Sequence, residues 1–180
     1  MEEKPSPKLH FETQSADEEI ILLLRAHVIT NVPWVFLVVI LFILPLISSL
    51  TSTFDPIFDP LGISETSARI LTLSWYFLAF AVALQNILHW YFNVYILTNK
   101  RIVDIDFQQL LYRKISSTEL SNVQDITYTK GGIPQSLFDY GDLHVQTAGT
   151  LPQFEFLRVP NPGEVQKEIE KAVGEYKNGL

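Results

Sequence analysis

The stretch that decides the fold runs from Ile70 to Asn99 and reads ILTLSWYFLAFAVALQNILHWYFNVYILTN. It lacks Asp, Glu, Lys and Arg, and it is longer than the roughly 20 residues that a helix needs to cross a bilayer. Leu, Ala and Phe dominate up to Leu88, whereas β-branched and aromatic residues dominate from Asn93 to Thr98. We therefore predict a membrane helix that runs almost directly into the first strand of a sheet domain.

A second apolar stretch, from Val32 to Leu50, lies closer to the N-terminus. The mean hydropathy of the chain is only +0.17 because polar residues outside the two stretches dilute it. A cleaved signal peptide does not fit the first stretch, since an acidic segment precedes it and signal peptides begin with a short basic region. We predict a transmembrane hairpin with helices at about 28–50 and 70–92, joined by an external loop at 51–69.

The orientation of this hairpin follows from Lys and Arg near the ends of the helices. Arg25 lies close before the first helix, and the second helix is followed by Lys100, Arg101, Arg113 and Lys114, whereas the loop contains only Arg69. Both termini are therefore expected to be cytoplasmic, in a multi-pass protein of the cell membrane. Three parts result: a cytoplasmic N-terminal segment at 1–25, the hairpin at 26–92, and a cytoplasmic domain at 93–180.

The sequence after the hairpin has the pattern of β-strands. Apolar residues alternate with polar ones at Val103, Ile105 and Phe107, and the same period recurs from Leu143 to Thr147. Glycine- and asparagine-containing turns separate such runs, which gives about six or seven short antiparallel strands.

The last part of the chain has the pattern of a single helix. Asn161 is a suitable N-cap, Pro162 suits the first turn, and Glu164 could complete a capping box. Apolar residues then recur at helical spacing: Val165, Ile169, Ala172, Val173 and Tyr176. A small sheet followed by one amphipathic helix suggests a barrel or half-barrel closed at one end by that helix.

Several sequence blocks occur in a recognisable order. They are YILTNKRI at 95–102, VQDI at 123–126, LFDYGDL at 137–143, TAG at 147–149 and VPNP at 159–162. From residue 17 onward, this order and spacing resemble the bacterial pleckstrin-homology-like membrane proteins. The resemblance implies a membrane α+β protein in which a two-helix transmembrane hairpin precedes a PH-like antiparallel barrel or half-barrel with a C-terminal capping helix. It implies little about activity, because fold does not fix function.

Two groups of residues are candidate contact sites. The four cations after the hairpin, Lys100, Arg101, Arg113 and Lys114, could contact lipid headgroups or a partner, or could simply set topology and solvate turns. Gln85, Asn86 and His89 make one face of the second helix polar, so they are candidates for helix–helix contact. The alternative, which we favour, is that the helix leaves the bilayer at this point. Phe138 and Tyr140 are either an exposed protein-binding patch or core residues.

Enzymatic chemistry is not indicated. The four histidines fall in different segments, no glycine-rich phosphate loop or nucleophile elbow is present, and the chain has no cysteine. We expect no cofactor, and the net charge of −7 without a basic cluster argues against nucleic acid as a partner.

The leading functional hypothesis is a non-enzymatic integral membrane protein that presents a binding or scaffolding module at the cytoplasmic membrane surface. Its expected partners are the bilayer itself and a second protein or another copy of the chain. The alternative is an oligomeric subunit of a transport or efflux assembly.

Overall fold

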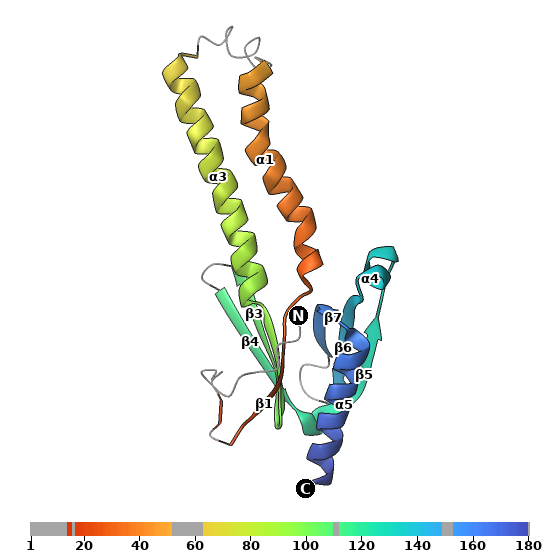
Figure 1. Ribbon diagram of the computed structural model, residues 1–180. Helices are drawn as coiled ribbons and strands as arrows, with labels where there is room; N and C mark the ends of the chain where they lie inside the picture. The colour runs from red at the N-terminus through yellow and green to blue at the C-terminus, as the bar shows by residue number, and fades with distance from the viewer. Residues whose placement is uncertain (1–13, 16, 52–62, 110–111, 149–152, 180) are drawn as a thin grey trace. The chain divides into compact units, whose positions relative to one another are not determined.

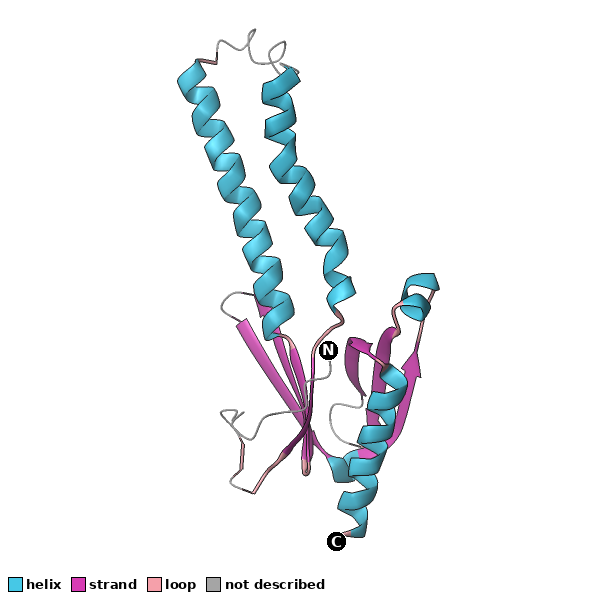
Figure 2. Cartoon of the chain, in the orientation of Figure 1, coloured by secondary structure: helices cyan, strands magenta, loops and turns pink. Residues whose placement is uncertain are grey.

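The computed structural model describes residues 14–15, 17–51, 63–109, 112–148 and 153–179. They fall into two compact units (Figures 1 and 2). Asn31–Leu88 forms a helical unit, and the described parts of Met1–Thr30 and His89–Leu180 together form a sheet unit. The sheet unit is therefore discontinuous in sequence.

Two antiparallel sheets make up most of the sheet unit. The four-stranded sheet has the order β1-β2-β3-β4 and the three-stranded sheet the order β5-β6-β7. The strands are β1 (Ile20–Leu24), β2 (Val94–Thr98), β3 (Arg101–Gln109), β4 (Tyr112–Glu119), β5 (Val123–Thr129), β6 (Tyr140–Thr147) and β7 (Gln153–Pro160). The 3-10 turn η3 (Leu120–Asn122) links the sheets, and the short helix α4 (Ile133–Leu137) links β5 to β6. The described strands thus form two sheets rather than one continuous barrel.

Strand β1 comes from the segment before the hairpin. Its Leu24 lies opposite Tyr95 and its Leu22 opposite Leu97, so β1 is the neighbour of β2 across the whole intervening hairpin. The sequence-based division placed these residues in an N-terminal segment outside the sheet. The run IILLL is short and has no alternation, so periodicity alone does not identify it as a strand.

The core of the sheet unit is formed by both sheets and by α5 (Pro162–Asn178). Val165, Ile169 and Ala172 lie on the buried face of α5, as the helical spacing predicts. The ring of Tyr95 on β2 stacks on Phe156 of β7, with 4.5 Å between ring centroids, and so joins the two sheets. Burial raises the pKa of Tyr95 to about 12, and its hydroxyl accepts a hydrogen bond from the Leu157 N–H.

The start of α5 matches the prediction in position and differs in detail. Asn161 is the N-cap and Pro162 the first helical residue. However, Asn161 has a φ of 45°, its N–H donates to the Asp139 carbonyl, and its side-chain amide faces the Glu164 carboxylate at 3.5 Å. The predicted reciprocal capping box is replaced by a contact between the two side chains.

The helical unit contains α1 (Val32–Thr51) and most of α3 (Glu65–Phe92), and the 3-10 turn η1 (Val28–Asn31) precedes α1. Helix α3 begins before the predicted residue 70, and residues 52–62 of the predicted loop lie outside the described residues. The stretches Val28–Leu50 and Glu65–Phe92 are both long and apolar enough to cross a membrane, and most of their large side chains are exposed.

One hydrogen bond between α1 and α3 has a clear origin in the sequence. Pro45 lies inside α1 and has no N–H to donate to the carbonyl of Leu41, four residues earlier. The indole N–H of Trp75, on α3, donates to this carbonyl at 2.8 Å. Phe42 and Tyr76 pack beside this bond, with ring centroids 5.6 Å apart. The proline thus creates the acceptor that α3 uses.

Only Asn93 separates α3 from β2, in agreement with the predicted passage from helix to strand. The Asn93 side-chain oxygen accepts the Phe107 N–H at 2.6 Å, so this linking residue is bound to β3.

Candidate functional site

The cations of the β2–β3 turn are both paired with the segment before β1. The Lys100 ammonium lies 2.8 Å from the Asp17 carboxylate. Arg101 donates through Nε and Nη2 to the two oxygens of Glu18, each at 2.8 Å. The Glu18 carboxylate also accepts hydrogen bonds from the Thr98 hydroxyl and the Ser15 N–H. The acidic segment Asp17-Glu18 therefore neutralises the turn that the sequence offers as a headgroup contact.

The Glu18–Arg101 pair is largely enclosed, because the Glu18 side chain is 0 % exposed and that of Arg101 only 23 %. Burial by itself would raise the pKa of Glu18, but the hydrogen bonds from Arg101, Ser15 and Thr98 outweigh it and hold the pKa below its ordinary value. The geometry is typical of a structural ion pair, with two parallel N–H···O bonds.

The other two predicted cations lie elsewhere on the four-stranded sheet. Arg113 and Lys114 are opposite Phe107 and Asp106, near the far end of β3 from Arg101. Six residues of strand correspond to roughly 20 Å. The side chain of Arg113 is not among those described, and Lys114 is exposed. The structure does not gather the four cations into one patch.

The polar residues near the end of α3 have separate partners. The Asn86 amide donates to the Val82 carbonyl of its own helix at 2.8 Å, and Gln85 is exposed. His89 Nδ1 lies 2.8 Å from the Phe107 carbonyl. Because a carbonyl only accepts, Nδ1 is the donor there, which leaves Nε2 to accept the Asn93 amide at 3.2 Å. His89 thus connects the end of α3 to β3.

The two crossings between units begin at one edge of the sheet unit, which we call the junction edge: residues 25–27, 89–93, 140 and 158. The indole N–H of Trp90 donates to the Ala26 carbonyl at 2.8 Å. The ring of His27 stacks on Tyr140, with centroids 5.6 Å apart, and the His27 N–H donates to the Arg158 carbonyl at 2.7 Å. Burial lowers the pKa of His27. The guanidinium of Arg25 lies over the Tyr91 ring, 4.7 Å from its centroid.

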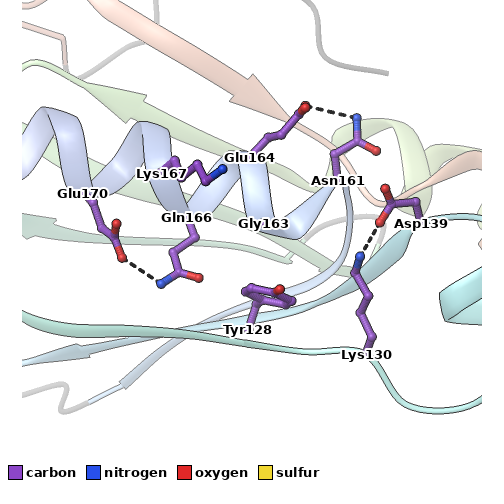
Figure 3. A pocket seen from close by; sticks show the side chains of 9 residues that line it. All are labelled: Tyr128, Lys130, Asp139, Asn161, Gly163, Glu164, Gln166, Lys167 and Glu170. Carbon is purple, nitrogen blue, oxygen red and sulfur yellow. Dashed lines mark hydrogen bonds and ion pairs between the residues drawn. The ribbon is translucent and has the colours of Figure 1, made fainter.

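A cleft of about 380 Å³ lies beside the first two turns of α5 (Figure 3). Its walls come from the end of β5, from the residue before β6, and from α5; they are Tyr128, Lys130, Asp139, Asn161, Gly163, Glu164, Gln166, Lys167 and Glu170. Lys130 forms an ion pair with Asp139 and lies 5.8 Å from the Tyr128 ring centroid. Gln166 donates to the Ile126 carbonyl and to the Glu170 carboxylate.

Glycine is required at position 141, near the start of β6, because other parts of the backbone lie very close to its Cα. A Cβ on Gly141 would lie 2.5 Å from the Thr129 carbonyl oxygen and 3.2 Å from the Pro162 ring. The carbonyl at the end of β5 approaches β6 at this point more closely than any side chain allows, and the start of α5 is also close.

The side chains that line the cleft are mostly charged or polar. Two lysines and three carboxylates line it, and one lysine, Lys130, is paired with Asp139. Among the described residues, no group of three or more His, Cys, Asp or Glu could hold a metal ion. The cleft thus presents both positive and negative charges, amide groups and one aromatic ring to a ligand.

A family model described as "Bacterial PH domain" matches residues 20–173. The chain belongs to the bacterial PH domain family. The match begins at the first residue of β1 and ends in α5, so it includes the strand that precedes the hairpin. The two antiparallel sheets and the C-terminal helix are the PH-like α+β fold of this bacterial PH domain protein.

Among solved structures, one similar chain is that of a DUF1696 family protein with a pleckstrin-homology domain from Shewanella loihica PV-4. It is 19 % identical, and the alignment covers 45 % of the present chain and 70 % of the other, with a TM-score of 0.37. No curated protein matches this bacterial PH domain protein.

The sequence alone did not identify the cleft or the junction edge. Tyr128, Lys130 and Gln166 carry no motif, and they meet only because β5 packs against α5. Of the two aromatic residues considered as an exposed patch, Phe138 is exposed, whereas Tyr140 is half-buried on His27. Aromatic pairing of this kind between distant segments has no local signal.

Proposed function

We propose that this protein is a membrane-anchored binding module without catalytic activity. One observation carries the proposal: two helices with mostly exposed apolar side chains are inserted between β1 and β2 of a bacterial PH domain. Exposed apolar surface of this extent is unfavourable in water, and a bilayer removes the cost. The domain is then attached to the membrane by two connections, each of only one to three residues.

The pairing of β1 with β2 supports a hairpin with both ends on one side of the membrane. Leu24 and Tyr95 lie opposite each other in one sheet, so the chain before α1 and the chain after α3 belong to the same folded unit. An even number of crossings satisfies this requirement. Basic residues flank these two ends, whereas Arg69 at the other end is paired with Glu65 at 3.2 Å. The bias favours a cytoplasmic domain.

The cleft beside α5 is the binding surface that we propose for a partner. Its two lysines and three carboxylates suit a polar segment of another protein, or of a second copy, better than a phosphate group. The β2–β3 turn is less suited to headgroup recognition, because Asp17 and Glu18 neutralise Lys100 and Arg101.

The anchor is tested by cysteine accessibility, for which the cysteine-free chain needs no background substitutions. Leu78→Cys lies in α3, and Lys177→Cys lies in α5. In sealed inside-out and right-side-out vesicles, a membrane-impermeant maleimide should label position 177 only when the cytoplasmic face is outside, and position 78 in neither orientation. Labelling of position 78 in both would refute the anchor.

The binding surface is tested by photo-crosslinking in native membranes. A benzoylphenylalanine at Tyr128 lies in the cleft, and one at the exposed Lys171 serves as the matched control on α5. We expect one polypeptide, identified by mass spectrometry, at position 128 and not at 171, and its loss when Lys167→Glu changes the charge of the cleft. Equal adducts at both positions would contradict the assignment.

A further inference from the structure

The short helix α4 carries an apolar surface that nothing in the described sheet unit covers. Ile133 is 83 % exposed and Leu137 is 72 %, the highest values among the large apolar side chains described there. Phe138, which follows the helix, is 45 % exposed. We call these three residues the α4 tip. Apolar side chains gathered at a surface in this way mark a contact site.

The backbone holds the α4 tip in place without burying it. Gly132 has a φ of 88° and turns the chain into the helix, where the Ser136 N–H and hydroxyl both bind the Gly132 carbonyl. The Phe138 N–H donates to the Pro134 carbonyl at 3.1 Å. Below the helix, the Lys130–Asp139 ion pair joins the two strands of chain that enter and leave it. The tip is therefore a defined structure that presents apolar side chains to its surroundings.

The position of the α4 tip within the sheet unit indicates what covers it. Tyr140 is two residues beyond Phe138, and its ring stacks on His27. His27 immediately precedes Val28, where the first membrane-length apolar stretch begins. The neighbouring Ala26 carbonyl binds Trp90, near the end of the second stretch. The tip thus lies beside the junction edge, from which both apolar stretches depart.

The charge of this segment fits the same occupant. From Gly131 to Phe138 the sequence is GGIPQSLF, which contains no charged residue, and the two charges that border it, Lys130 and Asp139, neutralise each other in an ion pair. Apolar and aromatic side chains without an uncompensated charge can bind at the boundary between headgroups and acyl chains.

We propose that the α4 tip inserts into the headgroup–acyl boundary of the membrane that the hairpin spans, and so forms a third attachment of the sheet unit to the bilayer. The inference rests on the proposed membrane anchor. Ile133 and Leu137 enter the apolar boundary, and Phe138 lies at the headgroup level. The domain is then held against the surface by apolar contact as well as by its two covalent connections.

The test is the depth of nitroxide labels on the full chain in nanodiscs of phosphatidylethanolamine and phosphatidylglycerol. Single cysteines replace Ile133 in the tip, Lys177 as the aqueous control, and Leu78 as the control for the hairpin. Pro162 and Lys177 are separated by roughly 22 Å along α5, so the aqueous control is remote from the cleft end of the helix. Collision with oxygen, which concentrates in lipid, is compared with collision with a water-soluble nickel chelate.

We expect the ratio of oxygen to nickel collisions at position 133 to exceed that at 177 severalfold and to approach that at 78. A water-like ratio at 133 with a lipid-like ratio at 78 overturns the inference and leaves the anchor intact. A water-like ratio at 78 overturns the anchor itself. If both collision rates at 133 fall together, a protein surface covers the tip, which also overturns the inference.

Discussion

At the scale of single residues, Glu18 is an enclosed ionisable group that joins the segment before β1 to the start of β3. Its carboxylate is enclosed, and it accepts hydrogen bonds from Arg101, Thr98 and Ser15. Removing one partner of an enclosed pair leaves the other charge without compensation, which costs more than the pair itself contributes.

We predict that Glu18→Ala destabilises the sheet unit by about 2–3 kcal/mol, less than for a fully buried pair because Arg101 is partly exposed. Glu18→Gln, which keeps the shape and one acceptor, should cost less. Asp17→Ala is the matched control, and it should change little because Asp17 is 83 % exposed. Hydrogen exchange of β2 and β3 peptides in detergent measures the effect. Equal protection in Glu18→Ala and Asp17→Ala would contradict it.

The pKa of Asp104 on β3 is shifted in the opposite direction to that of Glu18. Burial, together with the nearby Asp106, raises its pKa to about 6, and Lys114 only partly offsets this. At a pH between the ordinary pKa of aspartate and about 6, the folded protein therefore holds a proton on Asp104 that the unfolded chain has lost. Its stabilising contribution is therefore complete below the ordinary pKa of aspartate and is lost as the pH rises through about 6.

We predict that Asp104→Asn stabilises the sheet unit at pH 8 by about 1–2 kcal/mol and that this gain disappears toward pH 4. The figure is discounted because the side chain remains partly solvated. Asp125→Asn, at an exposed position of β5, is the control and should show no such trend. Unfolding by denaturant, followed through hydrogen exchange of β3 at several pH values, gives the comparison. A gain independent of pH would rule out the titration of Asp104 as its cause.

At the scale of elements, the boundary between α3 and β2 and the apolar stripe of α5 follow from local sequence. The composition changes at Asn93, which is where the helix ends, and Val165, Ile169 and Ala172 repeat at the helical period. The identity of β1 and the pairing of Glu18 with Arg101 do not follow, because each joins residues more than 70 positions apart. The cleft likewise combines residues of β5 with residues of α5, which are far apart in the sequence. Its existence therefore could not be predicted from local sequence patterns.

The bond between α1 and α3 provides a test at this scale. We predict that Trp75→Phe weakens the association of the two helices by about 1 kcal/mol, because the Leu41 carbonyl then loses its donor. Pro45→Ala restores a backbone N–H to that carbonyl, so the cost of Trp75→Phe should be smaller in the Pro45→Ala background.

A double-mutant cycle with unfolding in mixed micelles measures this coupling. Trp34→Phe is the matched control, because the Trp34 indole binds Asn31 and not a carbonyl freed by proline. The cost of Trp34→Phe should be the same in the wild-type background and in the Pro45→Ala background. Additive effects of Trp75→Phe and Pro45→Ala would show that the proline does not create the acceptor.

At the scale of the whole molecule, the sheet unit is complete only when chain from both sides of the hairpin is present. Leu22 and Leu24 of β1 are both in the hydrophobic core, and β1 provides the hydrogen-bonding edge for β2. Full burial of a leucine contributes about 1.5–3 kcal/mol, which is a large part of the stability of a small domain.

The decisive variant is one in which the hairpin is replaced by a short turn that joins His27 to Phe92. Because Leu24 already lies opposite Tyr95, a glycine- and asparagine-containing turn should close β1 and β2 into an ordinary antiparallel hairpin. We predict that this chain is soluble and gives well-dispersed amide resonances, whereas the fragment 93–180, which lacks β1, does not. Leu24→Asp in the joined chain should abolish the dispersion, since the side chain is 1 % exposed, and Glu19→Gln, on the exposed side, should leave it unchanged. If the 93–180 fragment folds by itself, β1 is an accessory to the domain. If this fragment does not fold but the joined chain does, the membrane hairpin is an insertion in a domain that includes β1.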